Sequence, residues 1–355
     1  MGNLSRTRRR ATPGRNGAVK RHRSIGSSVR EKIDRGPLRI PHDRKDWEVD
    51  LKGQHLRLTN LQKPFWPELG VTKGDLLQYY ADMAAVLLPH LANRAMVMKR
   101  YPNGAGGDFF FMKHAPRPRP AWLQICSIEH DSGNIVDFPV VQDLASLLYI
   151  VNLGCIDLNQ WYAACDDVDR PDYLHFDLDP VDPAGFEKVR DAALIVHEAL
   201  DELGIPNFAK TTGSRGIHIY VPIVRGPHQK DVWQFAKELA WALAERHPDT
   251  LTAEYRIAKR PPNRVLVDYN QNAWGRTLAS VYSVRPKPQA TVSTPVTWEE
   301  VANGTRTEDF RIDNVRERVR RVGDLWRPLL ARGGRCRLEH YISTTNKTDT
   351  SRRGR

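Results

Sequence analysis

Short strand-like runs and helical segments follow one another through the middle of the chain without a regular strand–helix–strand alternation. A doubly wound parallel sheet requires that alternation, because a crossover helix connects each parallel strand to the next. The sequence therefore predicts an α+β fold, with mixed or antiparallel sheets flanked by helices. The expected strands lie at 48–58, 95–100, 108–112, 122–128, 135–138, 156–161, 173–178, near 211, 218–221, 265–268 and 279–283. The expected helices begin at 72 and lie at 141–151, 183–203, 229–246 and 315–330.

Two of these expectations can be made more specific: where the first helix begins, and how the strands between 95 and 138 pair. Thr72 and Asp75 are spaced as a capping box, in which each side chain bonds the backbone N–H of the other residue. A helix is therefore expected to begin at Thr72. The four strand-like runs between 95 and 138 follow one another closely, and we expect them to pair as one antiparallel sheet.

Positive charge is concentrated at the two ends of the chain. There are 54 Lys and Arg against 42 Asp and Glu, but residues 1–45 and 331–355 carry net charges of +11 and +5, which leaves −4 for 46–330. Basic ends with few large apolar residues are expected to lack a packed structure. We therefore predict a basic N-terminal arm (1–45), a folded domain (46–330) and a basic tail (331–355). The ends suit non-specific phosphate binding, or they only increase solubility.

Membrane and secreted proteins are excluded on composition. No run approaches the roughly 18 apolar residues that span a bilayer, and the arginine-rich N-terminus has no apolar signal core. We expect a cytoplasmic protein with no membrane partner. Four cysteines, Cys126, Cys155, Cys165 and Cys336, are too far apart for a paired C-x-x-C zinc site. Since disulfides are not expected inside the cell, we interpret them as packing residues.

Asp177 and Asp179 are the first candidates for chemistry, in the sequence YLHFDLDP. On a strand, residues i and i+2 face the same side, so both carboxylates point toward one place. Two such groups can bind a pair of divalent ions and support phosphoryl transfer. A lone D-x-D pattern is also typical of a strand that ends in a turn, here before Pro180.

A glycine-rich polar loop, KTTGSRGIHIY, begins at residue 210 and runs into an alternating strand. Two glycines let backbone N–H groups turn toward an anion. Thr212, Ser214, Arg215 and His218 add hydroxyl and cationic partners for a triphosphate. The loop is not a Walker A motif, because no Gly-Lys-Ser/Thr opens a helix after it. An ordinary hairpin with a core histidine is the alternative.

A third group of candidates follows the apolar strand at 265–268. Asp268 ends that strand and could complete a metal site, and Gln271 follows it closely. Arg285 and Lys287, again at i and i+2, could face the phosphates together. Each feature alone is common, but their combination is not.

The order and spacing of HFDLDP, TTGSRGIHIYVPI and VDYNQNAWGRTLASVYSVRPKP resembles the archaeo-eukaryotic primase superfamily. The similarity is specifically to the polymerase domain of bacterial ligase D and its stand-alone relatives, and it covers about 47–330. It implies a primase-polymerase fold with the active site between two layers. It also implies a DNA-directed nucleotidyltransferase that uses two Mn²⁺ or Mg²⁺ ions and NTP or dNTP substrates, and that fills short gaps with a preference for ribonucleotides.

The resemblance also implies roles for individual residues. Asp177, Asp179 and Asp268 would be the catalytic, metal-binding carboxylates. The nucleotide-binding candidates are Thr212, Ser214, Arg215, His218, Gln271, Arg285, Lys287 and Lys99. Lys63 and Lys73 would bind the 5′-phosphate across a DNA gap, although without the resemblance they would be interpreted as surface lysines.

Phe110 and Phe111 match aromatic residues that stack on template bases. Their alternative is the core of a strand, and of three consecutive phenylalanines at least one is expected to point inward.

Asn159 departs from the ligase D pattern, which has histidine at this position. We therefore favour a stand-alone gap-filling enzyme of the Prim-PolC kind. It would be monomeric and nucleoid-associated, and would work beside a separate DNA ligase in excision repair, with end joining as the other pathway. Two alternatives remain. One is a non-catalytic module that bridges DNA gaps or ends through the 5′-phosphate, and the other is a two-metal nuclease.

Overall fold

The computed structural model describes residues 31–32 and 37–342, so most of the expected basic arm and part of the basic tail lie outside the described residues. The helices are α1 (Lys73–Leu91), α2 (Leu144–Asn152), α3 (Phe186–Glu202), α4 (Gln229–Arg246), α5 (Trp298–Ala302) and α6 (Val315–Val322), with short 3₁₀ turns η1 (Pro67–Leu69), η2 (Ile257–Lys259), η3 (Asn270–Asn272), η4 (Thr307–Asp309) and η5 (Arg327–Leu330). None of the described helices is long and apolar enough to cross a bilayer.

The strands form two main sheets and three small ones, as an α+β fold predicts. A six-stranded sheet has the order β14-β15-β11-β13-β12-β17 and a four-stranded sheet the order β16-β10-β6-β7. All their neighbouring strands are antiparallel except β14 and β15. The strands of these sheets are β6 (Met96–Arg100), β7 (Phe110–Met112), β10 (Cys155–Trp161), β11 (Tyr173–Pro180), β12 (Phe208–Thr211), β13 (Ile217–Pro222), β14 (Leu251–Thr252), β15 (Val265–Asp268), β16 (Thr277–Ala279) and β17 (Pro295–Val296).

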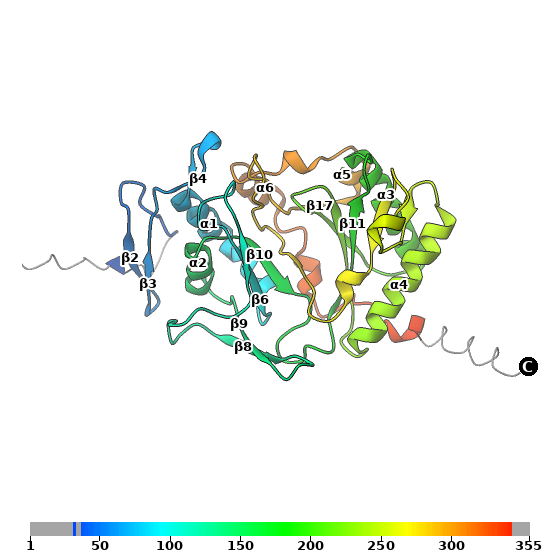
Figure 1. The fold of residues 1–355 in the computed structure, drawn as a ribbon, viewed down its shortest axis with the longest axis horizontal. Helices are drawn as coiled ribbons and strands as arrows, with labels where there is room; N and C mark the ends of the chain where they lie inside the picture. The colour runs from blue at the N-terminus through cyan, green and yellow to red at the C-terminus, as the bar shows by residue number, and fades with distance from the viewer. Residues whose placement is uncertain (1–30, 33–36, 343–355) are drawn as a thin grey trace, which may run out of the picture.

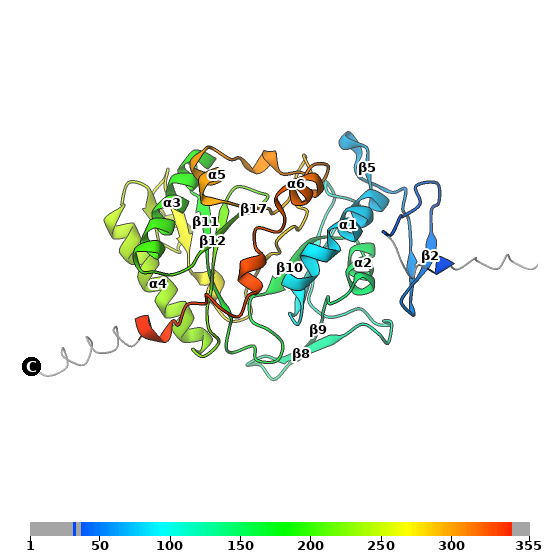
Figure 2. The ribbon, with the colours of Figure 1, turned by 180° about the vertical axis from the view of Figure 1, so that it is seen from behind.

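The six-stranded sheet is covered on one side by α3 and α4, while the four-stranded sheet lies toward the N-terminal half of the molecule (Figures 1 and 2). The alternation along β11 explains this arrangement. Leu174, Phe176 and Leu178 are fully buried and share one core with Val189 and Val196 of α3. The intervening residues of β11, including the two aspartates, therefore face away from the helices.

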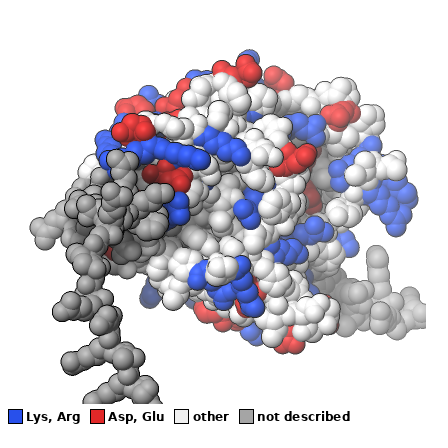
Figure 3. Space-filling model, turned by 60° about the vertical axis from the view of Figure 1, so that its left-hand side comes forward, with Lys and Arg blue, Asp and Glu red and all other residues white. Residues whose placement is uncertain are grey.

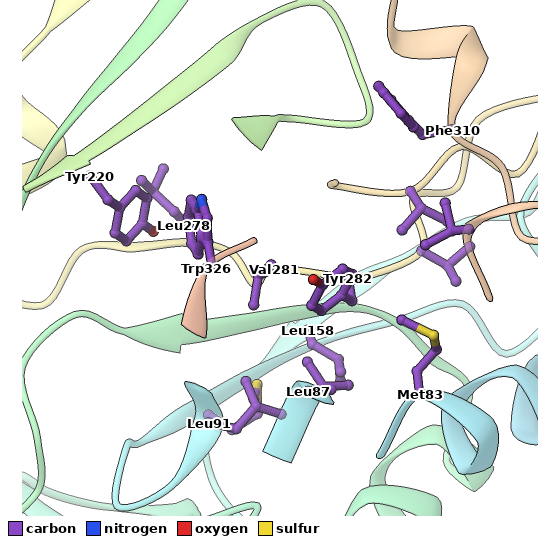
Figure 4. Close-up of a cluster of buried hydrophobic side chains, with 14 of the residues drawn as sticks. Met83, Leu87, Leu91, Leu158, Tyr220, Leu278, Val281, Tyr282, Phe310 and Trp326 are labelled. Atoms are coloured by element: carbon purple, nitrogen blue, oxygen red, sulfur yellow. The ribbon is translucent and has the colours of Figure 1, made fainter. Parts of the chain in front are cut away.

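A continuous apolar core joins the two halves. Figure 4 shows side chains of α1, β10, β13 and the C-terminal segments meeting between the sheets. The rings of Tyr220 and Trp326 pack in a tilted arrangement, with their centroids 4.7 Å apart. The Tyr79 hydroxyl donates to the Tyr282 carbonyl and the Tyr80 hydroxyl to the Ile156 carbonyl. The two sheets are thus held by one core.

Two predictions about strands were wrong, one for the run 48–58 and one for the runs between 95 and 138. The run 48–58 is not one strand but a hairpin, β2 (Trp47–Leu51) and β3 (Gln54–Leu58), because Lys52 and Gly53 adopt positive φ angles that turn the chain. The short β1 (Glu31–Lys32) pairs with β2, and β4 (Pro64–Trp66) pairs with β5 (Val71–Thr72).

The runs between 95 and 138 do not form one sheet either. β6 and β7 belong to the four-stranded sheet, whereas β8 (Ile125–Glu129) and β9 (Ile135–Pro139) form a separate hairpin.

The predicted ends of the folded domain also differ from the observed core. The helix expected at 315–330 ends at Val322, because Gly323 takes a φ of 73° that breaks it. Buried side chains begin at Leu38 and Ile40 and continue to Cys336 and Leu338. The core therefore reaches beyond both boundaries of the predicted domain 46–330.

The prediction that all four cysteines are packing residues was wrong for two of them. Cys126 of β8 and Cys165 form a disulfide, with their Cα atoms 5.9 Å apart. Cys155 and Cys336 are free and buried, as expected of packing residues. Spacing along the chain did not indicate the pair, because only the fold brings the β8–β9 hairpin against the segment after β10.

Candidate active site

Four charged or titratable side chains lie in register across four adjacent strands of the six-stranded sheet. Asp177 of β11 pairs with Asp268 of β15 on one side and with His218 of β13 on the other. His218 in turn pairs with Lys210 of β12. Directly opposite residues in a sheet share a face, so these four side chains form one line, which we call the cross-strand row.

The three predicted carboxylates lie close enough to perturb one another. The pKa of Asp179 is raised to about 7, first by the negative charge of Asp177 and then by burial. Burial raises the pKa of Asp177 to about 6. Burial and Asp177 together raise the pKa of Asp268. A buried cluster of like charges of this kind is stabilised by cations.

The donor set suits a hard divalent ion, since all three side chains offer carboxylate oxygens. Asp177 Oδ1 is buried, and the only contact recorded for it among the described residues is His218 Nε2 at 3.1 Å. Asp268 is less free, because its oxygens accept hydrogen bonds from the Asn270 N–H at 2.8 Å and from Gln271 Nε2 at 3.1 Å. Within residues 37–342, no three such groups are grouped as a preformed metal site. The oxygen ligands are of the kind that a divalent ion prefers, but the three carboxylates do not point at one common position.

The glycine-rich loop packs tightly beside the cross-strand row. Thr212 Oγ1 accepts the backbone N–H groups of Ser214 and Gly216 at 3.0 and 3.1 Å, so this hydroxyl shapes the loop. A Cβ on Gly213, whose φ is +66°, would lie 2.6 Å from Arg285 Cγ. A Cβ on Gly216 would lie 2.3 Å from the Leu178 carbonyl oxygen. Both glycines are therefore required by the close approach of the loop to its neighbours.

Arg285 and Lys99 converge on a residue that sequence reasoning missed. The buried carboxylate of Asp157 lies 2.6 Å from Arg285 Nε and 3.5 Å from Lys99 Nζ. Arg285 also donates to the carbonyl of Thr212, which ties it to the glycine-rich loop. Burial and the neighbouring Arg285 lower the pKa of Lys287. These cations gather beside the loop, as a triphosphate site requires.

Among the cationic candidates, Arg215 has few contacts with the rest of the site. Its guanidinium is largely exposed and lies 3.2 Å from the exposed carboxylate of Asp182. Its positive charge partly offsets the rise in the pKa of Asp179, so Arg215 lies near the carboxylate cluster.

Asn159 sits two residues after Asp157 on β10, so both share one face of that strand. Its amide donates to the Asp157 carbonyl at 3.2 Å.

Lys63 and Lys73 form a second group of cations. Lys73 is buried, and its Nζ donates to the Thr59 carbonyl at 2.6 Å and to Asn152 Oδ1 at 2.8 Å. Burial, with the charges of Lys63 and Arg100, lowers the pKa of Lys73 to about 8. A lysine buried in this way is not the solvated surface residue that was the alternative.

The expectation that one of three consecutive phenylalanines points inward was wrong. Phe109, Phe110 and Phe111 are 51%, 45% and 60% exposed. The reason is that β7 is a short strand at the edge of its sheet. Lys99 Nζ lies 4.0 Å from the centre of the Phe109 ring. An exposed aromatic group next to cations is suited to stacking on bases.

Two residues of the site were missed from sequence, Asp157 and Lys210. The alternation of KTTGSRGIH could have indicated Lys210, because it occupies the strand that precedes the loop as His218 occupies the strand that follows it. No local signal marked Asp157, since its partners lie far away in the chain.

The fold and the arrangement of carboxylates, glycine-rich loop and cations define a primase-polymerase. Residues 72–326 match the family model of the LigD primase-polymerase domain, and the chain belongs to that family.

The chain is 30% identical over 288 residues to the multifunctional non-homologous end joining protein LigD of Mycolicibacterium smegmatis, which covers 81% of this chain and 37% of that protein. It is 30% identical over 269 residues to the bifunctional LigD of Bacillus subtilis, covering 76% and 43%. The chain thus spans less than half the length of these relatives. Its structure is similar to that of the polymerase domain of Mycobacterium tuberculosis ligase D in complex with DNA, with a TM-score of 0.73 and 29% identity over 78% of this chain and 98% of that one.

Proposed function

We propose that this chain is a template-directed nucleotidyltransferase that fills short gaps in DNA during repair, with a preference for ribonucleotides. The observation that carries the proposal is the position of Asp177, Asp179 and Asp268 on one face of β11 and β15, beside a glycine-rich loop and a group of cations. A nuclease could use the carboxylates, but it has no need of a triphosphate site.

The three aspartates are the residues that would hold divalent ions. Two Mn²⁺ or Mg²⁺ ions supply a lowered pKa for the attacking hydroxyl and charge stabilisation for the leaving pyrophosphate. The polypeptide supplies the position of the triphosphate. Arg285 and Lys99, oriented by Asp157, bind its oxygens together with Lys287 and Arg215, while Thr212, Ser214, His218 and Gln271 complete the polar wall.

The DNA would be held by two further groups of residues. Lys63 and Lys73 would bind the 5′-phosphate on the far side of a gap, where a phosphate relieves the mutual repulsion of these cations and Arg100. Phe110 and Phe111 would stack on template bases, each contributing roughly 1–3 kcal/mol. On the face in Figure 3, Lys and Arg side chains are interspersed with Asp and Glu, so phosphate binding is expected to depend on such local groups.

The pathway is part of the proposal. The named relatives are end joining proteins, and we propose that this chain fills gaps at joined ends or in excision repair, as a monomer beside a DNA ligase at the nucleoid. Asn159 distinguishes it from the ligase D pattern.

Primer extension on a short gap with a 5′-phosphate tests the proposal, with Mn²⁺ or Mg²⁺ and with NTPs or dNTPs. The wild type and the control Asp249→Ala, a change of an exposed carboxylate on another surface, should extend the primer, whereas Asp179→Ala should not. Tight gap binding without extension by the wild type would instead support a bridging module. Strand cleavage without nucleotides would support a nuclease.

A further inference from the structure

Lys210 has a buried amino group that the proposed chemistry does not use. Its side chain is fully buried on β12, which lies between β13 and the edge strand β17. Nζ lies 2.8 Å from His218 Nδ1 and 2.5 Å from Ser293 Oγ, with the Trp326 ring at 5.8 Å. Among the described residues, no carboxylate lies within ion-pair distance of Nζ. Burying an amino group without a counterion is costly, and an apolar side chain of similar length would fill this space at less cost.

The hydrogen bonds around Nζ can be assigned a direction. Ser293 Oγ donates its own hydrogen to the Thr211 carbonyl at 3.0 Å, so it must accept a hydrogen from Lys210. A lysine amino group carries at least two hydrogens in either charge state, and a second one is available for His218. Lys210 can therefore donate to His218 Nδ1, which then carries a lone pair and no proton.

The opposite edge of the His218 ring leads to the same assignment. Nε2 lies 3.1 Å from Asp177 Oδ1, and that contact is repulsive unless the ring nitrogen carries a proton. Two neighbours on opposite sides of the ring, one donating and one accepting, thus favour a single tautomer.

We propose that Lys210 is a positioning residue, which holds the ring of His218 in the tautomer that presents Nε2–H to the active-site face of the cross-strand row. There the N–H faces Asp177 and, in the nucleotide complex, the triphosphate. This second part rests on the proposed function, whereas the tautomer itself does not. The role of Lys210 resembles that of the groups that orient histidines in other catalytic and metal sites.

The tautomer is measured directly by long-range ¹H–¹⁵N NMR of the full chain labelled with ¹⁵N-histidine, with His218→Gln to assign the signal. The expected result for the wild type is a protonated Nε2 and an unprotonated Nδ1. Lys210→Met, which keeps the length of the side chain but has no N–H, should lose that single pattern. A wild-type ring protonated at Nδ1, or at both nitrogens, overturns the proposal. A single pattern retained in Lys210→Met would overturn it as well, and the measurement requires no polymerase activity.

Kinetics of primer extension provide the second readout. Lys210→Met should raise KM for the nucleotide on the order of tenfold with a smaller change in kcat, as expected for one misplaced hydrogen-bond donor. Lys230→Met, an exposed lysine on α4, is the matched control. If Lys210→Met fails to fold, Ser293→Ala removes one acceptor of the amino group and should change KM in the same direction by less.

A double-mutant cycle separates positioning from general stability. Glutamine at position 218 carries its own N–H near the position of Nε2 and has no tautomers. In the His218→Gln background, Lys210→Met should therefore have little further effect on KM. Equal effects in both backgrounds would overturn the proposal. If the wild type extends no primer at all, the proposed function fails, and the NMR result still decides the role of Lys210.

Discussion

Arg285 Nε lies 2.6 Å from Oδ1 of Asp157, so a fully buried carboxylate orients a cation of the proposed nucleotide site. Lys99 contacts the other carboxylate oxygen, and Tyr101 donates its hydroxyl to the same atom at 3.5 Å. Asp157 thus lies behind two cations that face the glycine-rich loop. An incoming triphosphate would meet groups already fixed in direction, which lowers the entropy cost of binding.

Asp157→Asn should weaken nucleotide binding and destabilise the fold. The amide has nearly the same shape, but it leaves Arg285 and Lys99 without their buried counterion, a change that typically costs about 3–5 kcal/mol. KM for the nucleotide should rise at least about tenfold, and the melting temperature should fall. Asp313→Asn removes an exposed ion pair with Arg311 and is the control, with an expected change below about 1 kcal/mol. Similar values for both variants would show that Asp157 does not orient the cations.

Gly213→Ala tests whether the glycine-rich loop must pass close to Arg285. The new Cβ would lie 2.6 Å from Arg285 Cγ and 2.9 Å from backbone atoms of Val292 and Ser293, so the loop must move. We expect loss of nucleotide addition and a destabilisation of more than about 2 kcal/mol, measured by denaturant unfolding.

Gly204→Ala is a matched control for that change. Gly204 has the same φ of +66°, but a Cβ there meets nothing within 4 Å. Its cost should be limited to the left-handed backbone, roughly 1–2 kcal/mol, and activity should be retained. If the two substitutions behave alike, close packing against Arg285 is not what the loop requires.

Several parts of the fold and site could be predicted from local patterns. The bounds of α4 and β15, the capping box at Thr72 and the shared face of Asp177 and Asp179 all depend on neighbours within a few residues. Such features follow from helix and strand periodicity and from capping chemistry.

The features that were missed depend on strand order and on distant contacts. The cross-strand row requires β12, β13, β11 and β15 to be adjacent, which no single segment specifies. Asp157 and Arg285 are separated by a large part of the chain, and the disulfide partners Cys126 and Cys165 by 39 residues. The exposure of Phe109–Phe111 depends on β7 lying at an edge. In each case the information is in the tertiary arrangement and not in the local sequence.

The binding of a 5′-phosphate should depend on pH through Lys73. Its pKa is lowered to about 8 by burial and by neighbouring cations, so the amino group is charged below that pH and neutral above it. The ratio of the Kd for an unphosphorylated gap to the Kd for a 5′-phosphorylated gap should therefore be larger at pH 7 than at pH 9. Fluorescence anisotropy with the two DNAs measures this ratio. Lys73→Met should reduce it at pH 7 and remove its pH dependence, while Lys52→Met, an exposed lysine, should change neither.

Stability without metal should fall as pH rises through the range in which the aspartates ionise. The folded-state pKa values of Asp177 and Asp179, about 6 and about 7, lie above the value of 3.8 for a free carboxyl group. The folded state therefore binds protons more tightly, and its stability decreases from about pH 4 to about pH 7.

Asp179→Asn should reduce this decrease in stability, because it removes one negative charge from the cluster. At pH 8 without metal, the variant should melt about 1–2 °C higher than the wild type for each kcal/mol of repulsion removed, while at pH 4 the two should be alike. Adding Mn²⁺ should raise the melting temperature of the wild type at pH 8 and that of the variant much less. Calorimetry at the two pH values, with and without Mn²⁺, measures all of these differences. A wild type that is more stable at pH 8 than the variant in the absence of metal would show that the three carboxylates do not form a repulsive cluster.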